Sequence, residues 1–232
     1  AAARFVEHHL AEAGRLQDVV RVRAEVFGSL ALTGRGHGTD KAVLMGLEGH
    51  WPNAIDPDII PAALQRIRGG KRVRLAGSHE IGFDEKTDLV FNKRQKLPFH
   101  SNGMRYAAFD AAGAELATRD YYSVGGGFVV NPDEAAENRI VADTTPLPYP
   151  FKSGDELLAM CERAGLSIAG VMMANECSWR SEAEVRQGLL VIWRAMAACM
   201  LRGTRETGVL PGGLKVQRRA PGRARPQARQ PR

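Results

Sequence analysis

The chain has 232 residues, of which 44% are hydrophobic and 25% are charged, and its formal net charge is +6. This composition is that of a soluble globular protein and excludes a disordered polymer. No apolar run reaches the roughly 18 residues of a membrane span, and the N-terminal stretch lacks the uninterrupted apolar segment of a secretory signal. We therefore expect a cytoplasmic protein with no membrane partner.

The positive charge is concentrated at one end of the chain. Residues 215–232 contain seven basic and no acidic residues, which leaves 25 basic against 26 acidic residues elsewhere. The rest of the chain is therefore nearly neutral, and we expect no nucleic-acid-binding face on it. The Pro-, Arg- and Gln-rich tail is typical of a disordered segment. A non-native or frame-shifted end explains it better than an arm for nucleic acid or an anionic surface.

Residues 1–130 mix helix and strand patterns without the regular alternation of a βαβ fold, which favours an α+β class with a mixed α/β sandwich domain. Helical spacing of apolar residues predicts helices over 3–14, 39–49 and 59–70. Thr39 or Asp40 is the expected N-cap of the second helix, and paired glycines are the expected stop of the third. Strand patterns cover 18–32, 71–77, 87–92, 103–113 and 117–130, with a bulge expected at the glycines 125–127.

Residues 131–151 contain four prolines and little periodicity, so they are the expected linker between domains. Residues 152–214 read as the truncated start of an all-helical domain, with Ser153 or Asp155 and the Ser181–Glu184 capping box as helix starts. The last helix carries an apolar stripe that needs a partner surface, which makes a homodimer an expected assembly. The stripe consists of Val185, Leu189, Ile192, Met196 and Met200.

The sequence Gly34-Arg-Gly-His-Gly-Thr-Asp40 is the first candidate functional site. A histidine between glycines is unshielded by neighbouring side chains, and its ordinary pKa lets it move a proton near neutral pH. The N–H groups of Gly36 and Gly38, at the start of the helix near Thr39 and Asp40, would suit a substrate carboxylate. The alternative is a flexible glycine loop with an exposed histidine.

A second candidate lies in the sequence KLPFHSNGM, where His100 and Asn102 precede a strand. An amide donates and accepts hydrogen bonds and can hold a polar substrate, although an Asn-Gly turn beside a bystander histidine is the alternative. His50 and His79 lie in turn-like segments and are expected to be exposed. Cys161, Cys177 and Cys199 lack the close spacing of metal ligands and are expected to be buried free thiols.

Several blocks together resemble the bacterial iron–sulfur-dependent L-serine dehydratases (L-serine ammonia-lyases) of the single-chain type. These blocks are GSLALTGRGHGTDKAVLMGLEG, PFHSNGMRYAAFDAAG, YYSVGGGFVV, MMANECSWRSEAEV, GLLVIWRAMAACMLRG and GVLPGGLKVQRRA. The resemblance runs from about residue 4 to about residue 220 in the order of the family. It implies a small α+β domain, similar to a regulatory domain of some phosphoglycerate dehydrogenases, over a larger all-helical catalytic domain.

The resemblance also implies a reaction and its residues. L-serine would lose its α-proton and its hydroxyl to give aminoacrylate, which tautomerises and hydrolyses to pyruvate and ammonia. A [4Fe-4S] cluster on three cysteines would act as a Lewis acid on the hydroxyl, without pyridoxal phosphate. His37 would be the base for the α-proton, and His100 with Asn102 would position the substrate. Gly36, Gly38, Thr39 and Asp40 complete the expected substrate site.

Two departures from the family pattern limit this expectation. The family has an S-S-H-T-type motif upstream of the region matched here, and its cluster cysteines lie further along than Cys161, Cys177 and Cys199. We therefore expect a fragment that has no metal ligands of its own and is inactive by itself. The alternative function is a non-catalytic small-molecule-binding or dimerisation module.

Overall fold

The computed structural model describes residues 1–133, 144–210 and 214–224. The chain separates into two compact units, residues 1–140 and residues 141–232. The first contains the strands and the second is helical, which confirms the expected α+β class. The expected linker lies partly outside the described residues, and the expected domain bounds stay a prediction.

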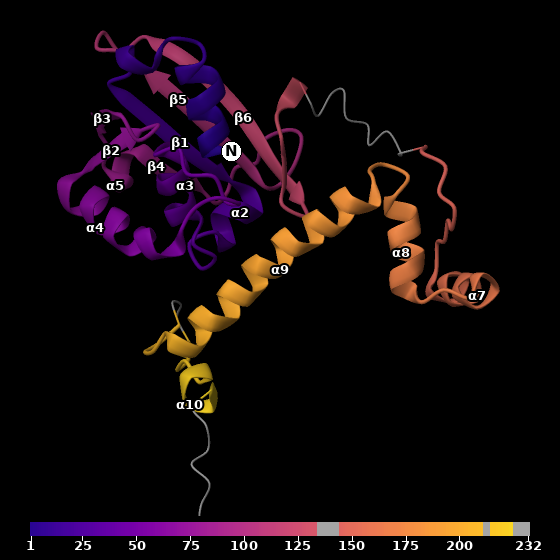
Figure 1. Ribbon diagram of the computed structural model, residues 1–232. Coiled ribbons are helices and arrows are strands. Elements are labelled where there is room, and N and C mark those ends of the chain that lie inside the picture. The colour runs from indigo at the N-terminus through magenta and orange to yellow at the C-terminus, as the bar shows by residue number, and fades with distance from the viewer. Residues whose placement is uncertain (134–143, 211–213, 225–232) are drawn as a thin grey trace, which may run out of the picture. The chain divides into compact units, whose positions relative to one another are not determined.

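Unit 1 is built on a five-stranded mixed sheet with the strand order β4-β1-β5-β6-β7 (Figure 1). Strand β1 pairs in parallel with β4 and antiparallel with β5, and the remaining neighbours are antiparallel. A separate hairpin is formed by β2 and β3. The bounds are β1 Arg21–Phe27, β2 Arg72–Leu75, β3 His79–Gly82, β4 Leu89–Asn92, β5 Gly103–Phe109, β6 Glu115–Gly125 and β7 Phe128–Val130.

The helical segments of unit 1 are short. Three of them precede β1, and the others lie between strands in sequence. Their bounds are α1 Ala2–Arg4, η1 Phe5–Ala11, η2 Leu16–Asp18, α2 Gly28–Thr33, α3 Thr39–Leu47, η3 Pro57–Ile59, α4 Ile60–Gly70 and α5 Glu85–Asp88. The first expected helix is confirmed, although η1 has π-helical rather than α-helical hydrogen bonding.

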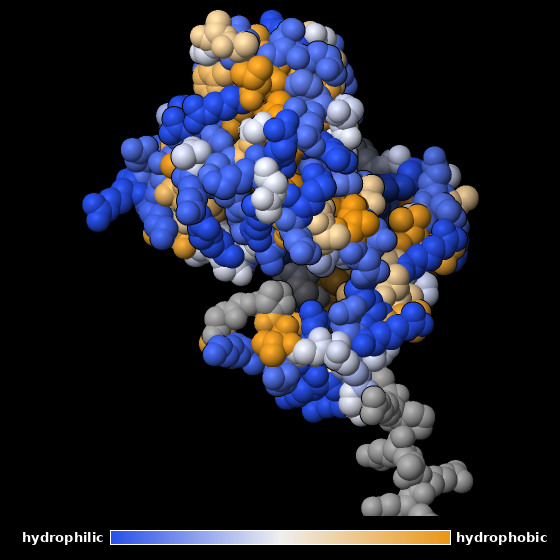
Figure 2. Space-filling view, turned by 90° about the vertical axis from the view of Figure 1, so that its left-hand side faces the viewer, coloured by the Kyte–Doolittle hydropathy of each residue, from blue (hydrophilic) through white to orange (hydrophobic). Residues whose placement is uncertain are grey.

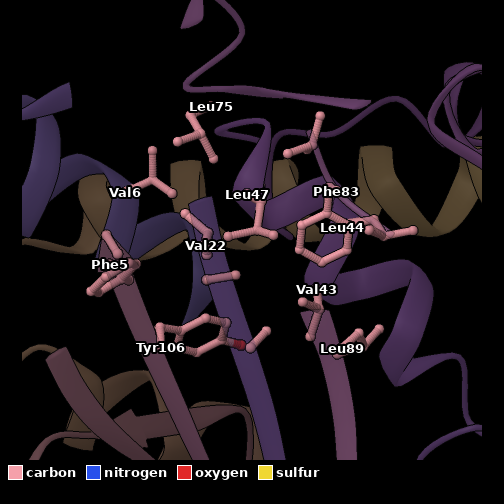
Figure 3. Packing of buried hydrophobic residues seen from close by; sticks show 14 of the residues in the cluster. Phe5, Val6, Val22, Val43, Leu44, Leu47, Leu75, Phe83, Leu89 and Tyr106 are labelled. Atoms are coloured by element: carbon pink, nitrogen blue, oxygen red, sulfur yellow. The ribbon is translucent and has the colours of Figure 1, made fainter. Parts of the chain in front are cut away.

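The alternating pattern of β1 places its apolar residues on one face of the sheet. Val22, Ala24 and Val26 are buried, and Ala24 lies opposite Tyr106 of β5 in the strand register. The ring of Phe5 stacks on Tyr106 with centroids 5.6 Å apart, and residues of α3 and the β2–β3 hairpin complete the cluster (Figure 3). Burial of this apolar area is the main stabilising contribution to unit 1.

On the face seen in Figure 2, hydrophilic residues predominate and hydrophobic residues form small, separate groups. In the sheet, the face opposite the core carries Glu25 and Arg105, which are opposite each other in the register, and Arg105 donates to Asp120 at 2.7 and 2.8 Å. One apolar and one polar face are expected of an antiparallel sheet region that packs on one side.

Three expected element boundaries in unit 1 are wrong. The strand predicted over 18–32 ends at Phe27, because Gly28 has a φ of 56° and turns the chain into α2. Gly38, with a φ of 76°, is the N-cap of α3, and Thr39 and Asp40 already lie inside that helix. Helix α4 includes both expected stop glycines and ends because Lys71 adopts a left-handed conformation with a φ of 49°.

Two further differences concern strands. Strand β3 was not expected, because its four residues lie in a segment with turn-like composition. The single strand predicted over 117–130 consists of β6 and β7, which turn at Gly125, Gly126 and Gly127, all with positive φ. The register between β6 and β7 shifts between Ser123 and Gly125, so the expected irregularity is present next to that turn.

Unit 2 contains α7 Gly154–Ala164, α8 Ile168–Glu176, α9 Glu182–Arg205 and α10 Ala220–Ala224. Ser153 caps α7, and the Ser181–Glu184 capping box starts α9, both as expected. Among the described helices none is by itself long and apolar enough to cross a membrane. Helices α7 and α8 meet that criterion only together, across a 92° bend. The expected disordered tail is described as far as Ala224 and includes α10.

The apolar stripe of α9 is mostly exposed. Val185 is buried, whereas Leu189, Ile192, Met196 and Met200 are each more than half exposed. The expectation of buried thiols is wrong, because Cys161 is half-buried and Cys177 and Cys199 are exposed on the surface. Helices α7 and α8 have 11 and 9 residues against the 24 of α9, and within the described residues of unit 2 most of the stripe and two of the three thiols stay exposed.

A buried carboxylate joins three elements of unit 1. Glu48 follows α3 directly, and its side chain is 5% exposed. Arg66 of α4 donates to both of its oxygens at 2.8 and 2.5 Å, and the N–H of Arg74 in β2 donates to it at 3.1 Å. These hydrogen bonds compensate for the removal of the charge from water.

Arg66→Ala should lower the free energy of unfolding of unit 1 by about 2 kcal/mol, because it leaves the buried carboxylate of Glu48 without its guanidinium partner. The urea dependence of amide hydrogen exchange in β1 and β5 measures this loss. Arg72→Ala is the matched control, since the Arg72–Glu80 pair is exposed on both sides and should contribute less than about 1 kcal/mol. Equal losses for the two variants would contradict the assignment.

His9 makes the stability of unit 1 depend on pH. It lies half-buried beside Phe5 and Tyr121, and burial, followed by the charge of Arg119, lowers its pKa below the ordinary value. The unfolded chain therefore binds a proton at a higher pH than the folded chain, so this stability is present above about pH 6.5 and is lost as the pH falls below it.

His9→Gln should therefore flatten the dependence of the unfolding midpoint in urea between pH 7.5 and pH 5.5. The difference between wild type and variant isolates His9. Parallel pH profiles for the two proteins would show that His9 does not make this contribution.

Candidate functional site

The glycine segment Gly34–Gly38 forms a tight corner between α2 and α3. The N–H of Gly34 donates to Leu30 at 2.8 Å, and the carbonyl of Gly34 accepts from Thr39 at 2.8 Å. The N–H groups of Gly36 and Gly38, which we expected to face a carboxylate, donate to the carbonyls of Thr33 and Arg35 at 3.0 and 3.3 Å. The corner is therefore closed by its own hydrogen bonds, and those two donors are used inside it.

Side chains fix this corner to the rest of unit 1. The guanidinium of Arg35 lies over the ring of Phe91 in β4, 4.5 Å from its centre, a contact of cation–π type. Asp40 accepts from Arg68 at 2.8 Å, and Arg68 also donates to Glu85 at 2.6 Å. The carboxylate of Asp40 thus takes part in an ion pair between α3 and α4.

The exposed imidazole of His37 has a defined hydrogen-bond role. Its Nδ1 lies 2.9 Å from the backbone oxygen of Thr33. A carbonyl oxygen only accepts, so in the neutral ring Nδ1 carries the proton and Nε2 has the free lone pair. A ring held in this tautomer can accept a proton at Nε2, as a general base must.

The half-buried imidazole of His100 has the opposite role. The backbone N–H of Asn102 lies 3.1 Å from His100 Nδ1. A backbone N–H only donates, so in the neutral ring Nδ1 accepts and Nε2 carries the proton. The two histidines predicted from the sequence therefore differ in tautomer, with an acceptor at Nε2 of His37 and a donor at Nε2 of His100.

The side-chain amide of Asn102 is bonded at both ends within unit 1. Its Oδ1 accepts from the hydroxyl of Ser29 at 2.6 Å, and its Nδ2 donates to the backbone oxygen of Ser123 at 3.3 Å. The backbone carbonyl of Asn102 accepts from the N–H of Ser123 at 3.0 Å. Asn102 thus connects the segment before β5 to both α2 and β6.

Helix α2 starts in close contact with the segment that carries His100. The N–H groups of Gly28 and Ser29 donate to Gln95 and Ser101 at 2.8 and 3.1 Å. A Cβ on Gly28 would lie 2.3 Å from the oxygen of Ser101, so the approach requires glycine. Helix α2 has six residues and is about 9 Å long. The two histidine-bearing segments are therefore held at its two ends.

Sequence reasoning missed Ser29 and Thr33, because a strand was predicted over residues 18–32. Ser29 lies within that range and Thr33 directly follows it. The signal that could have found them is the pair Ser29 and Thr33 at i and i+4, which is typical of a helix whose hydroxyls bond along it. Thr33 Oγ1 donates to the backbone oxygen of Ser29 at 3.0 Å.

Two histidines expected to be exposed are half-buried. His79 lies in β3, and its Nε2 donates to the backbone oxygen of Val19 at 2.6 Å. His50 lines a cavity of about 620 Å³ inside unit 1, between the N-terminal helical segment, α3 and the β6–β7 hairpin. Its lining is mainly apolar and includes Leu30, Thr39, Met104, Tyr106, Ser123 and Phe128. Of the predicted site residues, Thr39 lies on its wall.

The described residues do not fit an iron–sulfur cluster. Within residues 1–133, 144–210 and 214–224, no three His, Cys, Asp or Glu side chains come together as a metal site. Cys161, Cys177 and Cys199 are free thiols that do not form a group of ligands. These three thiols are therefore not placed to serve as the ligands of one cluster.

The fold and the site define a class: an α+β domain that presents two imidazoles of opposite tautomer from two segments joined by one short helix. The family model for the serine dehydratase beta chain matches residues 1–134. L-serine dehydratase of Streptomyces coelicolor is 50% identical over 97% of this chain and 49% of its own length. L-serine dehydratase 1 of Escherichia coli is 41% identical over 95% of this chain and 48% of its own length.

A further relative, L-serine dehydratase of Helicobacter pylori, is 36% identical over 95% of this chain and 48% of its own length. The chain belongs to the serine dehydratase beta chain family. It spans about half the length of the curated relatives that it matches.

Gly28→Ala should destabilise unit 1 by at least about 2 kcal/mol. The alanine would have to adopt a left-handed backbone conformation, and its Cβ would overlap the backbone oxygen of Ser101. Gly69→Ala in α4 is the control. Its Cβ meets no atom within 4 Å, and alanine should stabilise the helix by up to about 1 kcal/mol. Urea unfolding of both variants measures the effect. An unchanged midpoint for Gly28→Ala would refute the close approach.

Proposed function

We propose that this chain forms part of the active site of an L-serine ammonia-lyase, which converts L-serine to pyruvate and ammonia. The observation that carries the proposal is the 50% identity to an L-serine dehydratase over 97% of the chain. The geometry of the two imidazoles supports it, because β-elimination needs one group that takes a proton and one that donates to an oxygen.

In this proposal, Nε2 of His37 accepts the α-proton of L-serine. The electron pair of the broken C–H bond forms the double bond of aminoacrylate, and the hydroxyl leaves with the electron pair of the broken C–O bond. The departing hydroxide takes up one proton to become water, and loss of the α-proton from His37 to solvent restores the base. Nε2–H of His100 donates a hydrogen bond to a substrate oxygen and stabilises the charge that develops there. Aminoacrylate then tautomerises to an imine, which water hydrolyses to pyruvate and ammonia.

The remaining expected site residues have less direct roles in this proposal. Asp40 and Asn102 use their side chains in contacts with Arg68, Ser29 and Ser123. Asn102 contributes by fixing the tautomer of His100 through its backbone N–H. Contact of the substrate with Gly36, Gly38 or Thr39 stays a prediction.

The cofactor and the setting of the enzyme also belong to the proposal. A [4Fe-4S] cluster would supply a Lewis acid for the departing hydroxyl, with cysteine ligands other than the three described here. We propose a cytoplasmic enzyme whose partner is L-serine and which binds neither nucleic acid nor membrane. The homodimer expected from the stripe on α9 stays a prediction.

The alternative, a non-catalytic small-molecule-binding module, is favoured by one observation. The cavity of about 620 Å³ lies entirely within unit 1 and is large enough for a small organic ligand. Of the two histidines assigned to catalysis, neither lines it. Ligand binding in the cavity would therefore be insensitive to changes at His37.

A chimera tests the proposed function. Residues 1–224 of this chain replace the matching half of the Streptomyces coelicolor enzyme, and pyruvate formation from L-serine is measured. His37→Ala should lower kcat by about 10³-fold, because the base that takes the α-proton is lost, with the absorbance of the iron–sulfur cluster unchanged. His100→Ala should lower kcat less.

His50→Ala is the control in the same chimera, since His50 lies on the cavity wall and has no part in the proposed chemistry. Full turnover in His37→Ala would remove His37 from the mechanism. An inactive chimera with wild-type histidines, in which the chain still binds a small ligand, would favour the binding module.

A further inference from the structure

Ser29 lies where the segment that carries His100 meets the start of α2. It is in the first turn of the helix, and its side chain is exposed. Its hydroxyl is 2.6 Å from Asn102 Oδ1 and 3.3 Å from Ser101 Oγ. The shorter contact, to an oxygen that only accepts, identifies Asn102 as the acceptor of the single hydroxyl proton.

We propose that Ser29 is a positioning residue that fixes the tautomer and direction of the His100 imidazole. The inference rests on the proposed function for its catalytic consequence only. Ser29 touches neither imidazole, and it acts through Asn102.

The orientation of the Asn102 side-chain amide is set by its two hydrogen-bond partners. A terminal amide can rotate by half a turn and exchange its oxygen and nitrogen at nearly equal cost. The carbonyl of Ser123 cannot donate and therefore selects the orientation that turns Nδ2 toward it, and the hydroxyl of Ser29 donates to the oxygen at the other end. Removal of the hydroxyl leaves the amide held at Nδ2 alone, by a bond of 3.3 Å.

The tautomer of the His100 imidazole depends on the backbone N–H of Asn102. The backbone N–H of Asn102 lies in the peptide unit whose carbonyl, that of Ser101, accepts from the N–H of Ser29 at 3.1 Å. Its direction also depends on how the Asn102 side chain is held. The N–H donates to Nδ1 of His100 at 3.1 Å and leaves the proton of the neutral ring on Nε2. A looser Asn102 weakens this bond, and the ring then samples both tautomers, as a free histidine does.

Hydrogen bonds along α2 lead from Ser29 to His37 without using the hydroxyl of Ser29. The backbone oxygen of Ser29 accepts from Thr33 Oγ1 at 3.0 Å, and the backbone oxygen of Thr33 accepts from Nδ1 of His37 at 2.9 Å. These bonds lie within the helix and its C-terminal corner and do not involve the hydroxyl of Ser29. Loss of the hydroxyl should therefore affect His100 and leave His37 as it is.

If the hydroxyl of Ser29 served only to hold the fold together, Ser29→Ala would lower the stability of unit 1. Two backbone bonds, from Gly28 to Gln95 and from Ser29 to Ser101, already hold the start of α2 on this segment. The hydroxyl of Ser29 is exposed, so its removal costs little burial. Ser29→Ala should therefore fold normally and change the environment of one imidazole.

The experiment measures the tautomers directly on the whole chain labelled with ¹⁵N at histidine. Long-range ¹H–¹⁵N NMR spectra at pH 8 should show His100 protonated at Nε2 and His37 protonated at Nδ1. Ser29→Ala should shift both ring nitrogens of His100 toward the averaged values of a free histidine, with His37 and His79 unchanged. Ser29→Thr keeps the hydroxyl and should preserve the wild-type pattern.

Ser101→Ala is the matched control, because it removes the neighbouring hydroxyl, 3.3 Å from Ser29 Oγ, and leaves the bond to Asn102. An unchanged His100 pattern in Ser29→Ala, or an equal change in Ser101→Ala, would overturn the proposal. Loss of the dispersed spectrum in Ser29→Ala would overturn it as well, since the role would then be in folding.

The activity measurement separates this inference from the proposed function. In the chimera, Ser29→Ala should lower kcat about tenfold with a smaller change in KM, as expected for a misdirected donor. An altered tautomer of His100 without any loss of turnover would support the positioning role and contradict the part assigned to His100 in the reaction. The NMR result itself requires no substrate and stands whatever the chimera does.

Discussion

The close approach of Gly28 to the carbonyl of Ser101 is the contact on which the candidate site depends. Only a glycine allows the start of α2 to lie against the segment before β5, because any Cβ would overlap the carbonyl oxygen. With that contact in place, Ser29 reaches Asn102, and the far end of α2 places the glycine corner. The loops that carry His37 and His100, which are distant in sequence, are therefore both held by helix α2, which is about 9 Å long.

The two imidazoles differ in tautomer because each contacts a backbone group that can only accept or only donate a hydrogen bond. The carbonyl of Thr33 accepts and the N–H of Asn102 donates, so one ring is left with an acceptor at Nε2 and the other with a donor. Such a pair requires that the two backbone segments keep their directions, which the cross-links through α2 provide.

The sequence predicted what depends on local pattern and missed what depends on contacts between distant segments. The alternation in β1 and the capping box of α9 are properties of a few adjacent residues, and both predictions are confirmed. The segment after Phe27 keeps an alternating pattern, yet it is helical, because the segment before β5 accepts its first N–H groups. The same contact explains why Ser29 was missed while the histidines, whose chemistry is evident by residue type, were found.

The two units differ in how much of their apolar surface they cover. Unit 1 encloses its own cluster around β1 and α3, and every contact that fixes the two imidazoles lies within it. Helix α9 instead exposes five consecutive apolar residues, from Leu189 to Trp193, on all sides. A helical stretch that is apolar all round is typical of the interior of a larger packed structure. The relatives are about twice as long as this chain, so turnover is best measured in a chimera and the tautomers in the chain itself.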